Sequence, residues 1–173
     1  MASTPNENCV ETLKKPFGAK SVTITRIVSG GQTGADQAAL DFAIDRGIPH
    51  GGWIPKGRIT EAGVLSEKYL LTEMPTASYP KRTEQNVIDS DGTLIVSHGK
   101  LIGGAEHTCK MAEKHGKPCI HVDMENMPLK EAVTLIWDWI HENEIEVLNV
   151  AGARASNDTK IYPTTKSILE ALL

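Results

Sequence analysis

The sequence predicts a single α/β domain with a doubly wound parallel sheet and helices on both of its faces. Apolar, β-branched runs of strand length alternate with segments of helical periodicity from residue 21 to residue 173. The chain has 173 residues and no internal repeat or low-complexity segment. A chain of this length buries about 70% of its unfolded surface in one core. Right-handed crossovers between such strands produce the doubly wound arrangement.

The first strand is expected over residues 22–29, and the first helix over residues 36–46. Gly47 follows that helix and is a suitable C-cap. Residues 48–53 predict a short second strand, and residues 54–63 a polar loop.

Residues 64–74 are ambiguous between a helical turn and a short extended piece. The helix over residues 78–89 is clearer, because Ser78 can cap it and Pro80 suits its first turn. Residues 93–97, with the sequence TLIVS, predict a buried strand.

The C-terminal half continues the alternation of helices and strands. Gly116 is expected to end the helix that begins at Gly103. The expected helices are residues 103–115, 128–143 and 163–172, and the expected strands are residues 118–122 and 146–151.

The helix over residues 128–143 has the most regular apolar face. The positions i, i+4, i+7, i+8 and i+11 of one face hold Leu129, Val133, Ile136, Trp137 and Ile140. We therefore expect Trp137 in the core. Trp139 lies in a charged stretch and is expected at an interface.

Composition and charge limit the classes of partner. The net charge is −4 and the pI is about 5.9, so binding to nucleic acid or an anionic membrane through bulk charge is not expected. No apolar run approaches the roughly 20 residues of a membrane span. Residues 1–20 are expected to be a flexible tail, and residues 21–173 the folded domain. Cys9, Cys109 and Cys119 form no C-x-x-C pair, which is typical of reduced thiols in a cytoplasmic protein.

A glycine-rich turn, Ser-Gly-Gly-Gln-Thr-Gly-Ala-Asp at residues 29–36, joins the first strand to the first helix. Glycine lets the backbone approach a ligand closely, and the free N–H groups of a helix start attract anions. The spacing matches neither G-x-G-x-x-G nor G-x-x-x-x-G-K-[ST]. The turn therefore predicts a phosphate-like ligand without identifying a nucleotide.

In a doubly wound sheet, ligands bind at the edge where the strands have their carboxyl ends. A second pair of glycines, Gly103 and Gly104, lies at this edge. So do six cations of an acidic chain, namely Lys56, Arg58, Lys81, Arg82, Lys100 and Arg154. Arg82 and Asn86 are four residues apart and share a helix face. The edge is thus suited to a large anion, although each cation taken singly is equally explained as a solvated surface charge.

Three further residues at this edge have two interpretations each. Asp36 either stabilises the dipole of its helix or accepts a hydrogen bond from a ligand ring or hydroxyl. His98 either contacts the ligand or bonds a loop carbonyl. Trp53 either offers a flat face to a planar ligand or packs under its loop.

Catalytic and metal-binding patterns are absent from the sequence. The carboxylates of Asp89-Ser90-Asp91-Gly92 precede a strand, on the opposite edge, and are expected to bond backbone in a turn. The six histidines show no zinc-ligand spacing, and no nucleophile motif such as G-x-S-x-G occurs. We therefore predict no catalytic residue and no resident metal.

Several long motifs carry a family resemblance. They are SGGQTGAD at 29–36, GGWIPKGR at 51–58, RTEQNV at 82–87, DSDGTLI at 89–95 and LNVAGAR at 148–154. Together they resemble the molybdenum cofactor carrier protein family over residues 24–173. One departure is Ala153, where the family pattern suggests proline.

The resemblance implies a Rossmann-like, cytoplasmic homo-oligomer, a dimer or tetramer. Such a protein binds the molybdenum cofactor (molybdopterin) as cargo, stores it and delivers it to cofactor-accepting molybdoenzymes, without chemistry of its own. The resemblance and the position of the binding edge together give a set of expected cofactor contacts. These are Gly30, Gly31, Gln32, Thr33, Gly34, Asp36, Lys56, Arg58, Arg82, Asn86, His98, Gly103, Gly104, Thr108 and Arg154.

Two alternatives remain open. The fold group also resembles nucleoside-monophosphate phosphoribohydrolases, whose P-G-G-x-G-T-x-x-E motif ends in a catalytic glutamate. Here Cys109 and Lys110 stand where that acid is needed, and Glu106 is displaced toward the helix start. The second alternative is a nucleotide-sensing module, which would bind free nucleotides and be indifferent to molybdenum.

Overall fold

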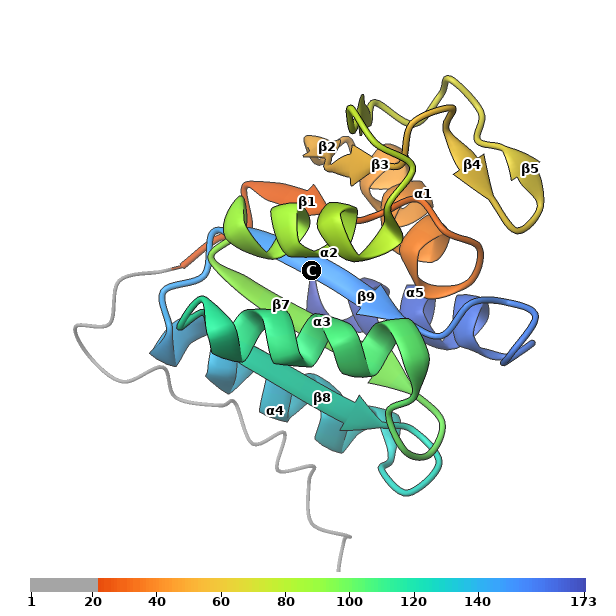
Figure 1. The fold of residues 1–173 in the computed structure, drawn as a ribbon. Coiled ribbons are helices and arrows are strands. Elements are labelled where there is room, and N and C mark those ends of the chain that lie inside the picture. Colours follow the sequence, from red (N-terminus) through yellow and green to blue (C-terminus); the bar gives the residue numbers. More distant parts are fainter. Residues whose placement is uncertain (1–21) are drawn as a thin grey trace, which may run out of the picture.

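The computed structural model describes residues 22–173, so the predicted tail and Cys9 lie outside the described residues. A five-stranded parallel sheet forms the centre of the fold (Figure 1). Its strands, in spatial order, are β2 (His50–Gly51), β1 (Arg26–Val28), β9 (Val147–Gly152), β7 (Gly92–Ser97) and β8 (Cys119–Asp123). The strand that comes last in the sequence therefore lies in the middle of the sheet.

Helices cover both faces of this sheet, as the sequence predicts. The helices α2 (Tyr79–Ile88) and α3 (Gly103–Lys114) pack side by side on one face (Figure 1). The other face carries α1 (Ala35–Arg46), α5 (Ile161–Leu172) and α4 (Leu129–Glu142), with α5 in contact with both of the others. The doubly wound, Rossmann-like class is confirmed.

The core lies where these layers meet. Every residue of β7 is buried, and Ile27, Leu94, Val96 and Leu148 have no more than a trace of exposed surface. Burying side chains of this size contributes about 1.5–3 kcal/mol each. The central strands therefore hold their carboxyl ends in fixed positions, which matters for a site at that edge.

The segment after β2 leaves the sheet. Gly52 has φ 128°, and a Cβ atom there would lie 2.2 Å from the carbonyl oxygen of Ser29. The expected strand over residues 48–53 is consequently divided into β2 and a separate strand, β3 (Trp53–Ile54). The division follows from Gly52, because only glycine tolerates both the close approach and the positive φ.

The expected loop over residues 54–63 contains additional structure. A hairpin is formed by β4 (Ile59–Thr60) and β5 (Gly63–Val64), and β3 pairs in parallel with β6 (Thr72–Glu73). A small apolar cluster, separate from the main core, joins this region to α1. Its buried members are Leu40, Ile54, Leu65, Tyr69 and Leu71.

The predicted face of α4 is rotated by about one position. Ala132, Ile136 and Ile140 are buried, whereas Trp137 is 38% exposed and stacks on the ring of His141. Trp139 packs against the core. The assignment of Trp137 to the core is therefore wrong, whereas the interface expected at Trp139 stays a prediction. The apolar residues of α4 lie on more than one face of the helix. Its apolar pattern alone therefore determines the buried face only to within one residue.

Within residues 22–173, no helix is both long enough and apolar enough to cross a bilayer.

Candidate functional site

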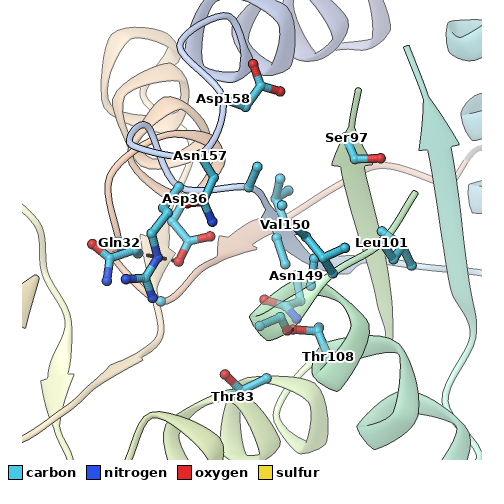
Figure 2. Close-up of a pocket in the computed structure, with 18 of the residues that line it drawn as sticks. Gln32, Asp36, Thr83, Ser97, Leu101, Thr108, Asn149, Val150, Asn157 and Asp158 are labelled. Carbon is cyan, nitrogen blue, oxygen red and sulfur yellow. Dashed lines mark hydrogen bonds between the residues drawn. The ribbon is translucent and has the colours of Figure 1, made fainter. Parts of the chain in front are cut away.

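A cavity of about 140 Å³ opens where β1, β7 and β9 have their carboxyl ends (Figure 2). Its walls come from α2, α3 and the loops that follow β1, β7 and β9. Nine of the residues expected to bind a cofactor line it, namely Gly30, Gln32, Asp36, Arg82, Asn86, His98, Gly104, Thr108 and Arg154. The carboxyl edge of the sheet thus brings together residues that are up to 124 positions apart in the chain.

A buried ion pair forms one wall. Nη1 of Arg82 lies 3.3 Å from Oδ2 of Asp36, and both side chains are about one-tenth exposed. Burial raises the pKa of the Asp36 carboxyl, and the neighbouring Arg82 guanidinium opposes this rise. Gly30 lies beneath the pair, because a Cβ atom there would be 1.2 Å from Nη1 of Arg82. The glycine at position 30 therefore provides the space that Arg82 occupies.

The glycine turn itself is largely closed by its own hydrogen bonds. The N–H of Gln32 donates to Asp36, the N–H of Thr33 to Oε1 of Gln32, and the N–H of Ala35 to the carbonyl of Ala153. These amides are no longer free to bind an anion.

Gly31, Thr33 and Gly34 do not line the cavity. A Cβ atom at position 31 would meet the side chains of Leu65 and Leu71, and one at position 34 the backbone of Ala153. Both glycines are thus explained by packing of the turn against its neighbours. The expectation of a phosphate cradle made by the whole turn is corrected accordingly.

The start of α3 is open instead. No side chain caps this helix, and a Cβ atom at Gly103 or Gly104 would meet nothing within 4 Å. Gly104 and Ala105 line the cavity, whereas Gly103 does not. The N–H groups at a helix start carry partial positive charge. The α3 start is therefore the part of the cavity best suited to an anion.

Two further cations, Lys100 and Arg154, lie on the cavity wall, and Lys100 belongs to the loop that leads into α3. Arg154 is 43% exposed at its side chain and lies 3.8 Å from a carboxylate oxygen of Glu61. A pair this long and exposed holds the guanidinium loosely.

Glu61 connects three loops at the edge of the cavity. It accepts hydrogen bonds from the hydroxyl of Thr33 and, at 3.1 Å, from the N–H of Ser156. The bond with the Ser156 hydroxyl is the main cause that lowers the pKa of Glu61. The sequence analysis missed this residue, because Glu61 lies in a hairpin that had been expected to be a loop.

Lys56 and Arg58 lie away from the cavity, contrary to expectation. Lys56 is exposed, and its N–H donates to the carbonyl of Thr76. Arg58 is buried, and its guanidinium donates to the backbone carbonyls of four residues, Leu65, Ser66, Tyr69 and Leu71. Four of the five N–H donors of this guanidinium are therefore used to hold a polypeptide segment together.

His98 lines the cavity and has a carboxylate as its partner. Nδ1 of His98 lies 2.6 Å from Oδ2 of Asp158, so this partner is not the loop carbonyl that the sequence left as one option.

Trp53 does not line the cavity, and its indole N–H donates to Asp89 at 2.7 Å. Trp53 therefore packs beside α2. The turn at residues 89–92 is structural as expected, since Asp91 accepts the N–H groups of Glu146 and Val147.

The cavity also contains neutral polar residues that the sequence analysis missed, chiefly Thr83, Asn149 and Asn157. Asn149 is buried within β9 and donates to the hydroxyl of Thr93 at 3.1 Å. An asparagine inside the apolar run of a strand was the signal that could have identified it. These side chains offer hydrogen bonds without charge.

No group on the cavity wall is arranged as a nucleophile with a base. Oγ of Ser97 lies 2.7 Å from Nε2 of His121, but the Ser97 hydroxyl donates to the carbonyl of Gly99 at 2.6 Å. The histidine nitrogen then faces the serine oxygen as a donor and does not serve as a base. Residues 22–173 contain no group of three or more His, Cys, Asp and Glu side chains placed to hold a metal.

Glu106, the acid required by a phosphoribohydrolase mechanism, does not line the cavity. Its carboxylate lies 2.7 Å from Nζ of Lys110 and is half exposed. Lys110 lowers the pKa of Glu106, which favours the ionised form and opposes action as a general acid.

Comparison with known proteins finds a family model and a similar solved structure. A model of the circularly permutated YpsA SLOG family matches residues 27–173. The crystal structure of a "putative molybdenum carrier protein" from Syntrophus aciditrophicus superimposes with a TM-score of 0.86 and 56% sequence identity. That alignment covers 87% of this chain and 96% of the other. No curated protein matches the chain.

Proposed function

Because the chain belongs to the circularly permutated YpsA SLOG family, we propose that it is a carrier of the molybdenum cofactor and holds this cargo in the cavity at the strand ends. The name of the similar protein from Syntrophus aciditrophicus, a molybdenum carrier, supports this proposal. The cofactor is a pterin with a phosphate and a dithiolene-held metal. Storage and delivery to accepting molybdoenzymes, by a cytoplasmic homo-oligomer, belong to the same proposal.

One observation carries the proposal, namely the uncapped, glycine-lined start of α3 inside the cavity. Its N–H groups and the side chains of Lys100 and Arg154 are the donors for the phosphate. Hydrogen bonds to charged groups contribute about 1.5–3 kcal/mol each. Two or three of them supply about 3–9 kcal/mol, against about 8 kcal/mol for micromolar binding.

The enclosed volume is smaller than the roughly 300–1,000 Å³ of typical small-molecule pockets. Part of the cargo therefore extends beyond the enclosed cavity, over its mouth. Leu101 and Ile102 lie there, and Ile102 is 66% exposed. They offer apolar contact to the part of the cofactor that is not enclosed.

A substitution that fills the cavity tests the site. Gly104→Leu adds a side chain where a Cβ atom meets nothing within 4 Å, so we expect unchanged stability and at least a tenfold loss of retained cofactor. The measurement is molybdenum and pterin content of protein purified without air, together with urea unfolding. Glu113→Leu, on the exposed far part of the same helix, is the matched control.

Cofactor retention by Gly104→Leu equal to that of the control would show that the cargo binds elsewhere. Tight binding of free nucleotides by protein that retains neither molybdenum nor pterin would favour a nucleotide-sensing module instead.

The absence of hydrolase activity is a separate prediction. Incubation with purine nucleoside monophosphates at high protein concentration is expected to release no free base, because Glu106 does not line the cavity and is paired with Lys110. Chromatography of the products is the measurement, and Glu106→Gln is expected to leave cofactor retention unchanged. Base release that Glu106→Gln abolishes would establish an enzyme.

A further inference from the structure

The charges on the cavity wall are unevenly distributed. Lys100 lies in the loop between β7 and α3, whereas Arg154 lies in the loop after β9 and is 3.8 Å from Glu61. Arg82 is paired with Asp36 through Nη1, while its Nε is buried without a hydrogen-bond partner. Asp158 also lines the cavity and bonds His98, and Thr83 and Asn149 are neutral. Among the described residues, Lys100 is the cation of the cavity wall with no carboxylate beside it, so the unbalanced positive charge lies at the α3 end.

The Asp36 carboxylate accepts hydrogen bonds from Arg82 and from the N–H groups of Gln32 and Gly30, which leaves one of its roughly four acceptor sites for a ligand. The bonds from Arg82 and from the N–H of Gln32 both end on Oδ2. Figure 2 shows one oxygen of Asp36 turned toward the middle of the cavity, which Asn149 and Asn157 also line. An ionised carboxylate is a strong acceptor for ring N–H groups, and it repels a phosphate.

We propose that this end of the cavity recognises the 2-amino-4-oxopyrimidine edge of a pterin, with Oδ1 of Asp36 accepting a hydrogen bond from its N–H groups. The inference rests on the proposed function and adds the orientation of the cargo. The pterin ring lies against Asp36, and the phosphate lies at the start of α3. The reverse orientation would place the phosphate against a carboxylate.

The neutral side chains complete this assignment. The amide groups of Asn149 and Asn157 have donors for the ring carbonyl and ring nitrogens, and the hydroxyl of Thr83 can donate or accept. Arg82 holds the Asp36 carboxyl in place and opposes the rise in its pKa that burial causes, and Gly30 leaves room for the pair. Asp36 is therefore the residue that distinguishes a ring bearing an amino group from one that lacks it.

The experiment compares two bicyclic rings that differ in one group. Pterin carries a 2-amino donor, and lumazine carries an oxo acceptor at the same position. Calorimetric titration of the purified protein with each ring, at neutral pH so that both rings keep their N–H groups, is expected to give about tenfold or tighter binding of pterin. Asp36→Asn is expected to remove most of this preference, and Asp45→Asn, an exposed position on the same helix, to keep it.

The outcomes separate the inference from the proposed function. Equal affinity for both rings, or binding of neither ring by protein that does bind the cofactor, would overturn the role of Asp36 and leave the carrier proposal standing. Protein that binds neither the cofactor nor either ring would overturn both. The preference of the unmodified protein decides the inference even where Asp36→Asn does not fold, which circular dichroism checks.

Discussion

Replacing Arg82 by methionine is expected to lower the free energy of unfolding by about 3–5 kcal/mol and to weaken cofactor retention at least tenfold. The guanidinium is about one-tenth exposed and is the cationic partner of a carboxylate that is buried to a similar degree. Without it, Asp36 is left as a buried, unpaired charge in the cavity that receives an anion. Urea unfolding and the molybdenum content of anaerobically purified protein measure the two effects.

The double variant Asp36→Asn/Arg82→Met is the control for this experiment. It removes both charges, so most of the lost stability should return, because the cost comes from the unpaired carboxylate rather than from a missing contact. Equal destabilisation in the single and double variants would contradict the explanation. Full cofactor retention by Arg82→Met would place the cargo outside this cavity.

Replacing Arg58 by methionine is expected to lower the free energy of unfolding by about 3–4 kcal/mol. The side chain is 7% exposed and its guanidinium donates to four backbone carbonyls between residues 65 and 71. Methionine fills a similar volume without a donor, so these carbonyls lose their partner. The measurement is urea unfolding, combined with hydrogen exchange of the amides in residues 58–74.

Lys56→Met, two residues away on the exposed surface, is the matched control and is expected to change stability little. Cofactor retention separates two explanations of Arg58. If Arg58 contacted the cargo, retention would fall in variants that remain fully folded. A local loss of exchange protection with normal retention is the result that the structure predicts.

The fold was predictable because its strongest signals are local. The buried run of β7, the cap and proline of α2 and the glycine that ends α1 each determine an element from a few neighbouring residues. The family resemblance is also confirmed by the family model and by the similar solved structure. The two-residue strands β3 to β6 were not predictable, since they depend on the turn at Gly52 and on pairing with distant segments.

The site was predictable as a position and less so as a set of contacts. Sorting residues by sheet edge placed Asp36, Arg82 and Arg154 around one cavity. The sequence does not show that Arg58 turns inward to bind carbonyls. A cation in a loop has the same sequence pattern whether its side chain faces solvent or the backbone. The sequence also does not show that the amides of the glycine turn are already bound, since this depends on a side chain folding back onto its own loop.

The central position of β9 has a consequence for the order of events in folding. Residues 26–28 pair with residues 147–149, and β7 pairs with the other side of the same strand. Until β9 is present, β1 with β2 and β7 with β8 are two separate strand pairs that share no ladder. Contacts this distant in sequence slow folding. On a ribosome, the two halves of the sheet, and Asn149 between them in the cavity, come together only after nearly the whole chain has been synthesised.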